Sequence, residues 1–586
     1  MPDIMDDPKR IASSRIASIA HHLSDTSDDT AAFIQSLRLY RQADQVAYIT
    51  PMDPLRFLLR SAMVFTNKPA ITHQGVTWTY RQLTERVLAL TNALIDDYQV
   101  QMGDRVGLLC QNIPIFIEAQ YAVPAAGAIV VPLNTRLAAT ELDYLIGHAG
   151  CNVLIVQQFF IDSQQVVIKQ LLAKYPHLQF IIVADTPQQP HLDPYEQLLR
   201  SHTTSHRRLW KDLPLLNDEN AVLSINYTSG STGKPKGVMV TYRGAYLNAL
   251  SMCLHTGINS SSVYLWTGPM FHCNGWGFIW GMIAAGGRQI MLNKVDYDVI
   301  WKIFKEEGVT HYHGAPTVQN EICNHPNATR LPTPVATFCG GAALSSTVIK
   351  RLLQLNIQPT HIYGLTETYG PAVISYMPWH LQNHCPNDQE GQVKLMARQG
   401  FNMTVNDELR VLDPDAQDVP SDGITVGEIC LSGNGVMRGY YNNSQETAKA
   451  FRHGVFWSGD LAVRHPDGAI EIVDRSKDVI VSGGENISSL EVESVIVQLD
   501  QVSECAVVGG PDDKWGERPY AYVVLRTNQV LRPDQVLAHC RKHLAGYKCP
   551  SNVMIVDSIP KTSTGKIQKF ILRNELWKDK QKKVQG

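Results

Sequence analysis

The sequence has no uninterrupted run of about 18 apolar residues, the length that a membrane-spanning helix requires. Its most apolar stretch, residues 115–133, is broken by Glu118 and Pro124. The first apolar stretch of the chain is interrupted at Arg15, so it lacks the pattern of a secretory signal. The sequence therefore predicts neither a membrane span nor secretion.

An excess of either charge is also missing, since 52 Lys and Arg face 55 Asp and Glu and the formal net charge is -3. Without a basic field, neither nucleic acid nor an anionic membrane is expected as a partner. The eleven cysteines include no Cys-x-x-Cys pair. We expect most of them to be reduced and buried, as in an intracellular protein.

Internal repeats with a period of about 20–50 residues and low-complexity tracts are absent too, which argues against solenoid and fibrous folds. The 586 residues exceed the usual size of one domain. Residues 1–50 are polar and weakly periodic, and we predict that they form an N-terminal arm. A composition shift after residue 474 divides the rest into a large domain, 51–476, and a small α+β domain, 477–586.

Short apolar segments alternate with helical spacing in the large domain, which predicts parallel sheets with covered faces. Helices are predicted over 81–95 and 345–355, the second capped by Ser345 or Ser346. The predicted strands of the large domain are 76–80, 106–110, 129–133, 152–156, 180–183, 335–339 and 361–363. Those of the small domain are 505–508, 520–525 and 553–556.

A glycine- and hydroxyl-rich segment, Tyr227–Gly237, follows an apolar strand over 221–225. Its glycines permit tight turns, and its hydroxyl and backbone N–H groups can surround phosphate oxygens. Lys234 and Lys236 add positive charge. The segment is not a Walker A loop, because no glycine lies five residues before the Gly-Lys pair. A flexible linker rarely carries two lysines and a proline after a buried strand, so we interpret it as another kind of phosphate loop.

A second segment, Gly364–Thr368, is predicted as a loop at the carboxyl end of a strand, where α/β sheets bind ligands. Glu367 can ligate Mg²⁺, and Thr366 can donate to a phosphate oxygen. The small residues Gly340–Ala343, one βα unit earlier, would let an adenine ring lie against the backbone. A lone loop glutamate is usually only solvated, but the two segments together favour a nucleotide site.

Three further segments complete the set. Asp460 and Arg475 can hold two ribose hydroxyls. The alternative interpretation is that they form an ordinary ion pair on the surface. The segment Ser482–Ile487 is rich in glycine. The loop Pro560–Lys566 ends in a lysine that can reach another domain's site, whereas most such lysines are simply exposed.

In this order and at these separations, the five segments resemble those of the superfamily of acyl-CoA synthetases, carrier-loading adenylation domains and firefly luciferase. The resemblance covers about residues 50–575. The chain is most similar to the acyl-activating branch with plant benzoate and short-chain acyl-CoA ligases, through Pro269–Trp276, Tyr363–Gly370, Lys394–Gly400 and Val479–Asn486. The resemblance implies an α/β N-terminal domain of two sheets and a β-barrel, followed by a small, mobile α+β C-terminal domain.

Carried over residue by residue, the resemblance implies a site for ATP. The residues implied to bind the triphosphate are Thr228, Ser229, Gly230, Ser231, Thr232, Gly233, Lys234 and Lys236. Those implied to line the adenine are Gly341, Ala342, Ala343, Tyr363 and Gly364. Asp460 and Arg475 would hold the ribose. Glu367, next to Thr366, would bind Mg²⁺, and Lys566 would bridge the substrate carboxylate and the α-phosphate.

The resemblance also implies a second step, in which coenzyme A takes the acyl group. A hinge at Lys477, two residues after the ribose arginine, would turn the C-terminal domain and withdraw Lys566. The residues that would then face the pantetheine tunnel are Ser482, Gly483, Gly484 and Glu485. The expected enzyme is an AMP-forming acyl-CoA ligase. Its co-substrates would be ATP and coenzyme A, and its metal ion would be Mg²⁺.

The class of carboxylic acid substrate is limited by residues of this chain that match known positions of the family. Gly364 stands where acetate-specific relatives carry a tryptophan that closes the acyl pocket, which favours a longer or bulkier acid. His272 stands nearest to the aspartate that amino-acid-loading domains use, and no acidic residue lies between Phe271 and Trp276. The residues implied to shape an apolar pocket are Trp276, Gly314, Tyr369 and Pro371. We expect a short- to medium-chain or small aromatic monocarboxylate.

Histidines in apolar segments allow two interpretations. His272 matches a family position for an aromatic gate or a neighbour of the substrate carboxylate, and a packed core histidine fits equally well. His311 and His313 alternate onto one face of a strand, but a metal site needs more ligands than two.

Two other functions and one targeting signal stay open. The thiol acceptor can be the phosphopantetheine of a carrier protein, although no carrier domain is fused to this chain. A non-catalytic adenylate-binding scaffold is disfavoured by the presence of Lys566, Glu367 and Asp460. Arg15-Ile16 and His22-Leu23 resemble the type-2 peroxisomal nonapeptide, which would make an import receptor a partner, or they begin a short amphipathic helix.

Overall fold

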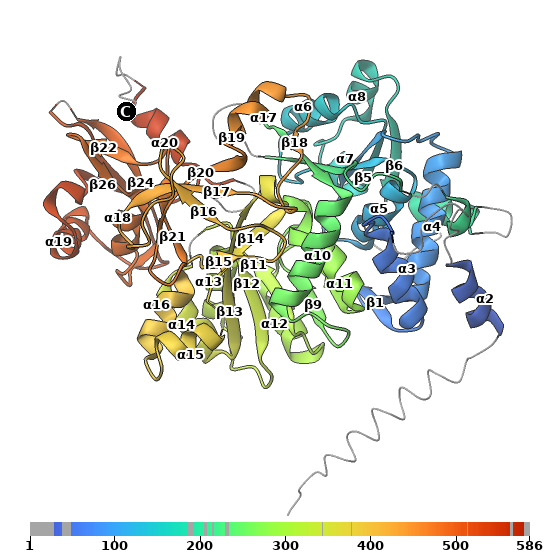
Figure 1. Cartoon of the computed structure of the whole chain (residues 1–586), viewed down its shortest axis with the longest axis horizontal. Helices are drawn as coiled ribbons and strands as arrows, with labels where there is room; N and C mark the ends of the chain where they lie inside the picture. Colours follow the sequence, from blue (N-terminus) through green and yellow to red (C-terminus); the bar gives the residue numbers. More distant parts are fainter. Residues whose placement is uncertain are drawn as a thin grey trace, which may run out of the picture.

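The computed structural model describes ten stretches of the chain, and Figure 1 shows its C-terminal elements, orange to red, at the opposite end from the first, blue elements. The described residues are 28–37, 49–185, 193–203, 208–213, 216–228, 234–342, 344–376, 378–512, 514–562 and 567–578. Three sheets lie in the large N-terminal part and one in the smaller C-terminal part.

The seven-stranded sheet carries the phosphate-loop candidate. Its strands in spatial order are β18 (Gly439–Tyr440), β8 (Gly237–Thr241), β7 (Val222–Tyr227), β4 (Ile129–Pro132), β3 (Arg105–Leu109), β5 (Val153–Gln157) and β6 (Gln179–Val183). The strands from β7 to β6 run parallel, while β8 and β18 are antiparallel to their neighbours. Every residue of β5 is buried, as expected for a parallel strand covered on both faces.

The nine-stranded sheet carries the adenine and acyl candidates. Its strands in order are β15 (Phe401–Asn402), β14 (Gly370–Ile374), β13 (Ile357–Leu365), β12 (Val335–Cys339), β11 (His311–Gly314), β9 (Val263–Trp266), β10 (Arg288–Met291), β1 (Pro69–His73) and β2 (Val76–Thr79). The central strands, from β13 to β1, run parallel, and antiparallel strands close both edges.

The remaining sheets have five strands each. The antiparallel sheet that stands where the β-barrel is expected consists of β16 (Arg410–Leu412), β17 (Val426–Leu431), β20 (Val455–Arg464), β19 (Phe451–Arg452) and β21 (Ile470–Arg475). The C-terminal sheet consists of β23 (Glu485–Ile487), β22 (Ile480–Ser482), β25 (Gly516–Leu525), β24 (Val502–Asp512) and β26 (Asn552–Ile555). The C-terminal helices are α18 (Ser489–Ile496), α19 (Pro533–His543), η4 (Gly546–Lys548) and α20 (Lys569–Leu576).

The helices of the N-terminal part follow the strands that they connect. Up to residue 256 they are α2 (Asp28–Ser36), α3 (Leu55–Val64), α4 (Tyr80–Asp96), α5 (Pro114–Ala125), α6 (Ala139–Ala149), α7 (Gln158–Asp162), α8 (Ile168–Lys174), α9 (Pro194–Ser201), η1 (Trp210–Asp212) and α10 (Tyr242–Thr256). After it they are η2 (His272–Gly277), α11 (Phe278–Ala285), α12 (Tyr297–Glu306), α13 (Pro316–Asn324), α14 (Ser346–Gln354), η3 (Thr366–Thr368), α15 (Pro378–His384), α16 (Gln389–Ala397) and α17 (Ser444–Ala450).

Local sequence explains why several elements begin where they do. Thr79 caps α4 through a reciprocal capping box, in which its hydroxyl accepts from Gln82 N and Gln82 Oε1 accepts from Thr79 N. Ser345 caps α14 by accepting from Val348 N, so that predicted cap is confirmed. The structure agrees with most predicted elements to within one residue at each end.

Three predicted strands are longer than expected, because only their apolar centres gave a sequence signal. β24 and β25 pair along their polar ends, and β13 extends from Ile357 to Leu365. The predicted loop over Gly364–Thr368 is therefore wrong for its first two residues, which continue β13 and pair with β14. The predicted arm contains the helix α2, whose Phe33 is buried. The Arg15–Leu23 pattern lies outside the described residues and stays a prediction.

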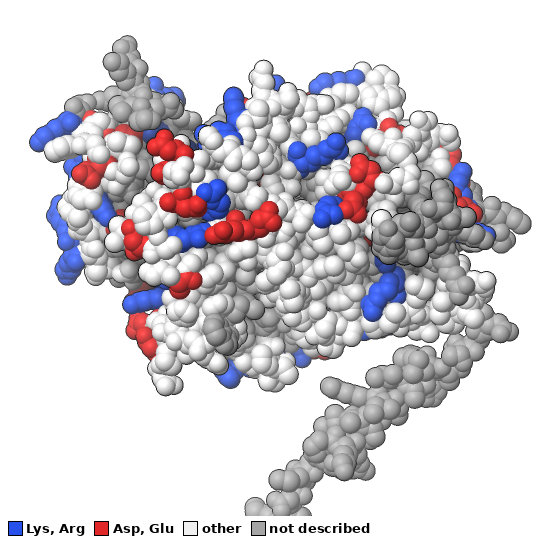
Figure 2. All heavy atoms as spheres, viewed as in Figure 1, with Lys and Arg blue, Asp and Glu red and all other residues white. Residues whose placement is uncertain are grey.

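One hydrophobic cluster joins the two large sheets. It includes Ile155 of β5 and Tyr264 of β9, together with side chains of α4, α5, α10 and α11. Within the described ranges, no helix combines the length and the apolar character needed to cross a bilayer. On the face shown in Figure 2, basic and acidic side chains are interspersed around broad uncharged areas.

Candidate active site

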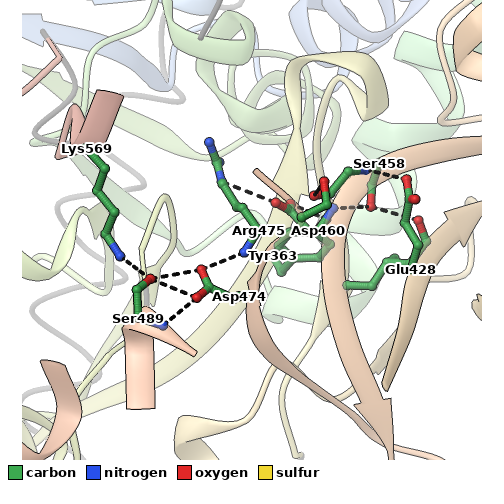
Figure 3. A network of polar contacts seen from close by, with 11 residues as sticks. Tyr363, Glu428, Ser458, Asp460, Asp474, Arg475, Ser489 and Lys569 are labelled. Atoms are coloured by element: carbon green, nitrogen blue, oxygen red, sulfur yellow. Dashed lines mark hydrogen bonds and ion pairs between the residues drawn. The ribbon is translucent and has the colours of Figure 1, made fainter. Parts of the chain in front are cut away.

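The predicted ribose ligands lie together on two adjacent strands. The register of β20 and β21 sets Asp460 opposite Arg475, and Arg475 Nε lies 3.2 Å from Asp460 Oδ1. The hydroxyl of Tyr363, on β13, donates to Asp460 Oδ2 at 2.8 Å (Figure 3). Asp460 is only 5% exposed and the Arg475 side chain is 29% exposed, so the pair is more buried than an ordinary surface ion pair. Each carboxylate oxygen keeps a lone pair that a ribose hydroxyl can use.

The part of β20 just before Asp460 is held by β17. Gly459 N donates to Glu428 Oε1 at 2.7 Å, and the Ser458 hydroxyl donates to the Ile429 carbonyl at 2.7 Å. Asp460 N in turn donates to Ser458 Oγ at 3.1 Å. Gly459 has a φ of 78°, a left-handed conformation that favours glycine. Glu428 therefore fixes the direction of Asp460, a role for which the sequence has no local signal.

The predicted metal ligand, Glu367, is half-buried in η3. The hydroxyl of Tyr440, on β18, donates to Glu367 Oε1 at 2.8 Å, and Met437 N donates to the Glu367 carbonyl at 2.7 Å. Burial raises the pKa of the Glu367 carboxyl, and the hydrogen bond from Tyr440 opposes this shift without reversing it. A buried carboxylate oxygen with spare lone pairs is a hard ligand of the kind that Mg²⁺ prefers. Sequence reasoning missed Tyr440, which lies 73 residues away.

The ends of the phosphate loop are closed by a backbone hydrogen bond of 3.0 Å from Thr228 N to Lys236 O. Lys236 Nζ lies 4.2 Å from the ring centre of Tyr440 and 3.3 Å from Glu446 Oε2. Lys236 of the phosphate loop and Glu367, the predicted metal ligand, thus both contact Tyr440. Lys234 Nζ lies 5.4 Å from the Tyr144 ring. The loop residues Ser229, Gly230, Ser231, Thr232 and Gly233 lie outside the described residues.

The small residues predicted for adenine have different local reasons. Gly341 is exposed with a φ of 86°, and no atom lies within 4 Å of where a Cβ would stand. A Cβ on Gly364 would overlap the carbonyl oxygen of Gly370, so the pairing of β13 with β14 requires glycine there. Ala342 is exposed next to Gly341, and Ala343 lies outside the described residues.

The predicted acyl-pocket residues meet at a left-handed segment. The φ values of Cys273, Asn274, Gly275, Trp276 and Gly277 are 36°, 40°, 69°, 57° and 78°. A Cβ on Gly370 would lie 3.0 Å from Trp276 Cα, so this segment packs directly against β14, which carries Pro371. The hydroxyl of Tyr369 accepts from Asn274 Nδ2 at 3.0 Å and from Trp280 Nε1 at 2.9 Å. Gly314 ends β11 against Val318.

The histidines near this segment are neutral at neutral pH. Burial lowers the pKa of His272 to about 4, and burial and the nearby His272 lower that of His313 to about 3. The His313 ring lies 4.7 Å from the Trp276 ring, and its Nδ1 shares a 2.6 Å hydrogen bond with Tyr264. His311 Nε2 lies 3.2 Å from the Thr256 carbonyl. The described part of the chain contains no group of three His, Cys, Asp or Glu residues arranged to hold a metal.

The predicted coenzyme A residues belong to the C-terminal sheet. Ser482 is buried, while Gly483, Gly484 and Glu485 are exposed at the turn between β22 and β23. Lys477 is exposed between β21 and β22, and its carbonyl accepts from Arg573 Nη1 at 3.4 Å. Lys566 lies outside the described residues, shortly before α20.

Comparisons with known proteins identify the family of the chain. Residues 58–441 match the family of AMP-binding enzymes, and residues 491–566 match the AMP-binding enzyme C-terminal domain. An acetate–CoA ligase of Humulus lupulus is 38% identical over 546 residues, which cover 90% of this chain and 95% of the relative. A 4-hydroxybutyrate–CoA ligase of Metallosphaera sedula is 37% identical over 538 residues, again 90% and 95% of the two chains.

A trans-cinnamate:CoA ligase of Petunia hybrida, named as peroxisomal, is 34% identical over 546 residues, 90% of this chain and 94% of the relative. The crystal structure of ATP-bound MatB from Rhodopseudomonas palustris shares the fold, with a TM-score of 0.78 at 24% identity over 91% of this chain and 100% of that one. The chain therefore belongs to the AMP-binding enzyme family. Within it the chain groups with the acyl-CoA synthetases, because these relatives are CoA ligases and the alignments span both partners almost completely.

Proposed function

We propose that the protein is an AMP-forming ligase that activates a monocarboxylic acid with ATP and transfers the acyl group to coenzyme A. The observation that carries this proposal is the convergence of two clusters. One is the ribose pair Asp460 and Arg475 with Tyr363, and the other is Glu367 with Tyr440 and Lys236. Together they supply partners for the ribose, the phosphates and a metal ion of one nucleotide.

In the first half-reaction, a carboxylate oxygen of the acid attacks the α-phosphorus of ATP, and pyrophosphate leaves. The oxygens of the phosphates gain negative charge, which fixed positive groups stabilise. Lys234, Lys236 and the loop before them would bind the triphosphate, and Lys566 would bridge the carboxylate and the α-phosphate. Glu367 would hold Mg²⁺, which supplies further positive charge at the phosphates when bound.

The neutral His272 can share a hydrogen bond with the substrate carboxylate without adding a charge. In the second half-reaction, the sulfur of coenzyme A attacks the acyl carbon, the bond to phosphate breaks, and AMP leaves. Rotation about Lys477 would bring Ser482–Glu485 to the pantetheine for this step. That hinge also sets the proposed boundary between domains 51–476 and 477–586.

The proposed acid class rests on the residues predicted to line the acyl pocket and on the relatives. Trp276, Tyr369 and His313 are buried aromatic side chains close to β14, and such a surrounding would suit an apolar acyl group. The relatives are named for acetate, 4-hydroxybutyrate and trans-cinnamate. We therefore propose a short- to medium-chain or small aromatic monocarboxylate.

The test is pyrophosphate release with ATP and Mg²⁺ over acetate, butyrate, 4-hydroxybutyrate and trans-cinnamate, each with and without coenzyme A. Sustained turnover that needs coenzyme A, for one of these acids, is the expected result. Release that stops near one equivalent despite coenzyme A points instead to a carrier-protein acceptor. If no acid leads to pyrophosphate release, the proposal is contradicted and the hypothesis of a non-catalytic adenylate-binding scaffold is favoured.

A further inference from the structure

A network of mostly buried polar side chains begins on β21, the strand that carries Arg475, on the side opposite to Asp460. Asp474 precedes Arg475 on β21, so the two side chains point to opposite faces of the strand (Figure 3). Asp474 is 2% exposed, and its carboxylate accepts from Arg475 N at 2.7 Å. It also accepts from Ser489 N at 2.6 Å and from the Ser489 hydroxyl at 2.8 Å. Ser489 is the first residue of α18 and is fully buried.

The network continues to the first residue of α20. Lys569 Nζ donates to Ser489 Oγ at 2.6 Å and lies 2.7 Å from Glu493 Oε1. Val507 N, on β24, donates to the same oxygen of Glu493. A mostly buried cation thus contacts Glu493 directly and Asp474 through Ser489, and these two carboxylates lie on opposite sides of the proposed hinge. Such an arrangement is stable only while its members stay paired.

The network crosses the proposed hinge at Lys477. Asp474 is fixed to the N-terminal part, because β21 pairs with β20 at Leu461 opposite Asp474. Ser489 and Lys569 belong to the helices that pack on the C-terminal sheet. A rotation about Lys477 would carry both away from Asp474 and would take two hydrogen-bond donors from a buried carboxylate. Removing such donors is unfavourable unless water or other groups replace them.

We propose that Asp474 and Ser489 form a latch, which holds the C-terminal domain in the orientation seen here and must open before thioester formation. This inference rests on the proposed function, in which two half-reactions use two orientations. The closed latch belongs to the adenylation state. The predicted coenzyme A residues Gly483, Gly484 and Glu485 are exposed while the latch is closed. Lys569 holds the start of α20, the helix that follows Lys566, through its hydrogen bond to Ser489. Asp474 is a positioning residue that links the ribose arginine to the domain orientation.

The first arm of the test needs no turnover. Ser489→Ala and Asp474→Ala should each speed tryptic cleavage after Lys477 roughly tenfold over wild type, because a hydrogen bond to a charged group is lost and the hinge is freed. The matched control is Glu491→Gln, on the same helix, whose carboxylate pairs with Lys548 at 2.8 Å rather than with Asp474. Cleavage in Ser489→Ala no faster than in this control overturns the latch.

The second arm measures the half-reactions separately. With butyrate, ATP and Mg²⁺, Ser489→Ala should release pyrophosphate roughly tenfold more slowly than wild type. With butyryl-adenylate and coenzyme A, its rate of thioester formation should be unchanged or higher. An equal fall in both rates shows a general structural defect and also overturns the latch. A wild type that activates no acid refutes the proposed function instead, and the cleavage rates then decide whether the latch exists.

Discussion

Glu367 shows how folding prepares a single residue for its ligand. Burial raises the pKa of its carboxyl, and the hydrogen bond from Tyr440 only partly offsets this. A carboxyl with a raised pKa contributes stability below its unfolded pKa and loses that contribution as pH rises through the folded pKa. At neutral pH, Glu367 therefore costs the ligand-free protein folding free energy, which a bound cation can recover.

Replacing Glu367 with glutamine should separate stability from activity. Glu367→Gln keeps the oxygen that accepts from Tyr440 but removes the ionisable group. We expect a higher melting temperature than wild type at neutral pH, with the difference shrinking in mildly acidic buffer, and a roughly hundred- to thousandfold slower pyrophosphate release. Glu491→Gln, whose half-exposed carboxylate pairs with Lys548, should change neither. A variant that melts no higher than wild type at neutral pH contradicts the burial argument.

At the scale of the element, the left-handed run in η2 determines the wall of the proposed acyl pocket. Five consecutive positive φ values turn the chain so that Trp276 faces His313 and its backbone meets Gly370. Non-glycine residues in this conformation cost about 1 kcal/mol or more each, so the segment depends on its packing. Gly277 ends the run beside the buried side chain of Asn248.

Two glycines allow the backbone cost to be separated from the steric cost. A Cβ on Gly277 would overlap Asn248 Oδ1, whereas one on Gly308, whose φ is 62°, meets nothing within 4 Å. Gly308→Ala should cost about 1 kcal/mol for the left-handed backbone alone. Gly277→Ala should cost roughly 2–4 kcal/mol and raise the KM for the acid. Melting temperatures measure the first effect, and equal losses in the two variants would refute the packing argument.

At the scale of the whole molecule, the C-terminal part is joined to the rest through a short segment between β21 and β22. The predicted coenzyme A residues Gly483, Gly484 and Glu485 are exposed in this orientation. In the proposed function both Lys566 and Ser482–Glu485 must reach the same acyl group, and a single fixed orientation would require both to do so at once. The proposed alternation resolves this conflict.

Two lysine variants should show opposite defects. Lys566→Ala should slow acyl-adenylate formation by orders of magnitude, because the developing charge loses a cation, and should largely spare thioester formation from butyryl-adenylate. Lys477→Pro should do the reverse, because proline restricts the backbone at the hinge. Each variant is the control for the other. Equal losses in both half-reactions would refute the assigned roles, and full activity in Lys477→Pro would move the hinge elsewhere.

Much of the fold was predictable because burial leaves a periodic pattern. The strand at Val335–Cys339 and the helix α4 agree with the sequence interpretation, since apolar residues recur there at strand and helix spacing. The extent of β13 was not predictable. Gly364 and Leu365 join it through pairing with β14, a contact that propensity does not encode.

The amino-acid sequence by itself determined the family, the order of the motifs and the type of each proposed ligand, because these depend on residue identity and spacing. The tertiary structure decided which side chains meet. The contacts of Tyr440 with Glu367 and of Lys569 with Ser489 join residues that are 73 and 80 positions apart. Their proximity follows from strand register and domain packing, which depend on contacts across the whole molecule and leave no local pattern in the sequence.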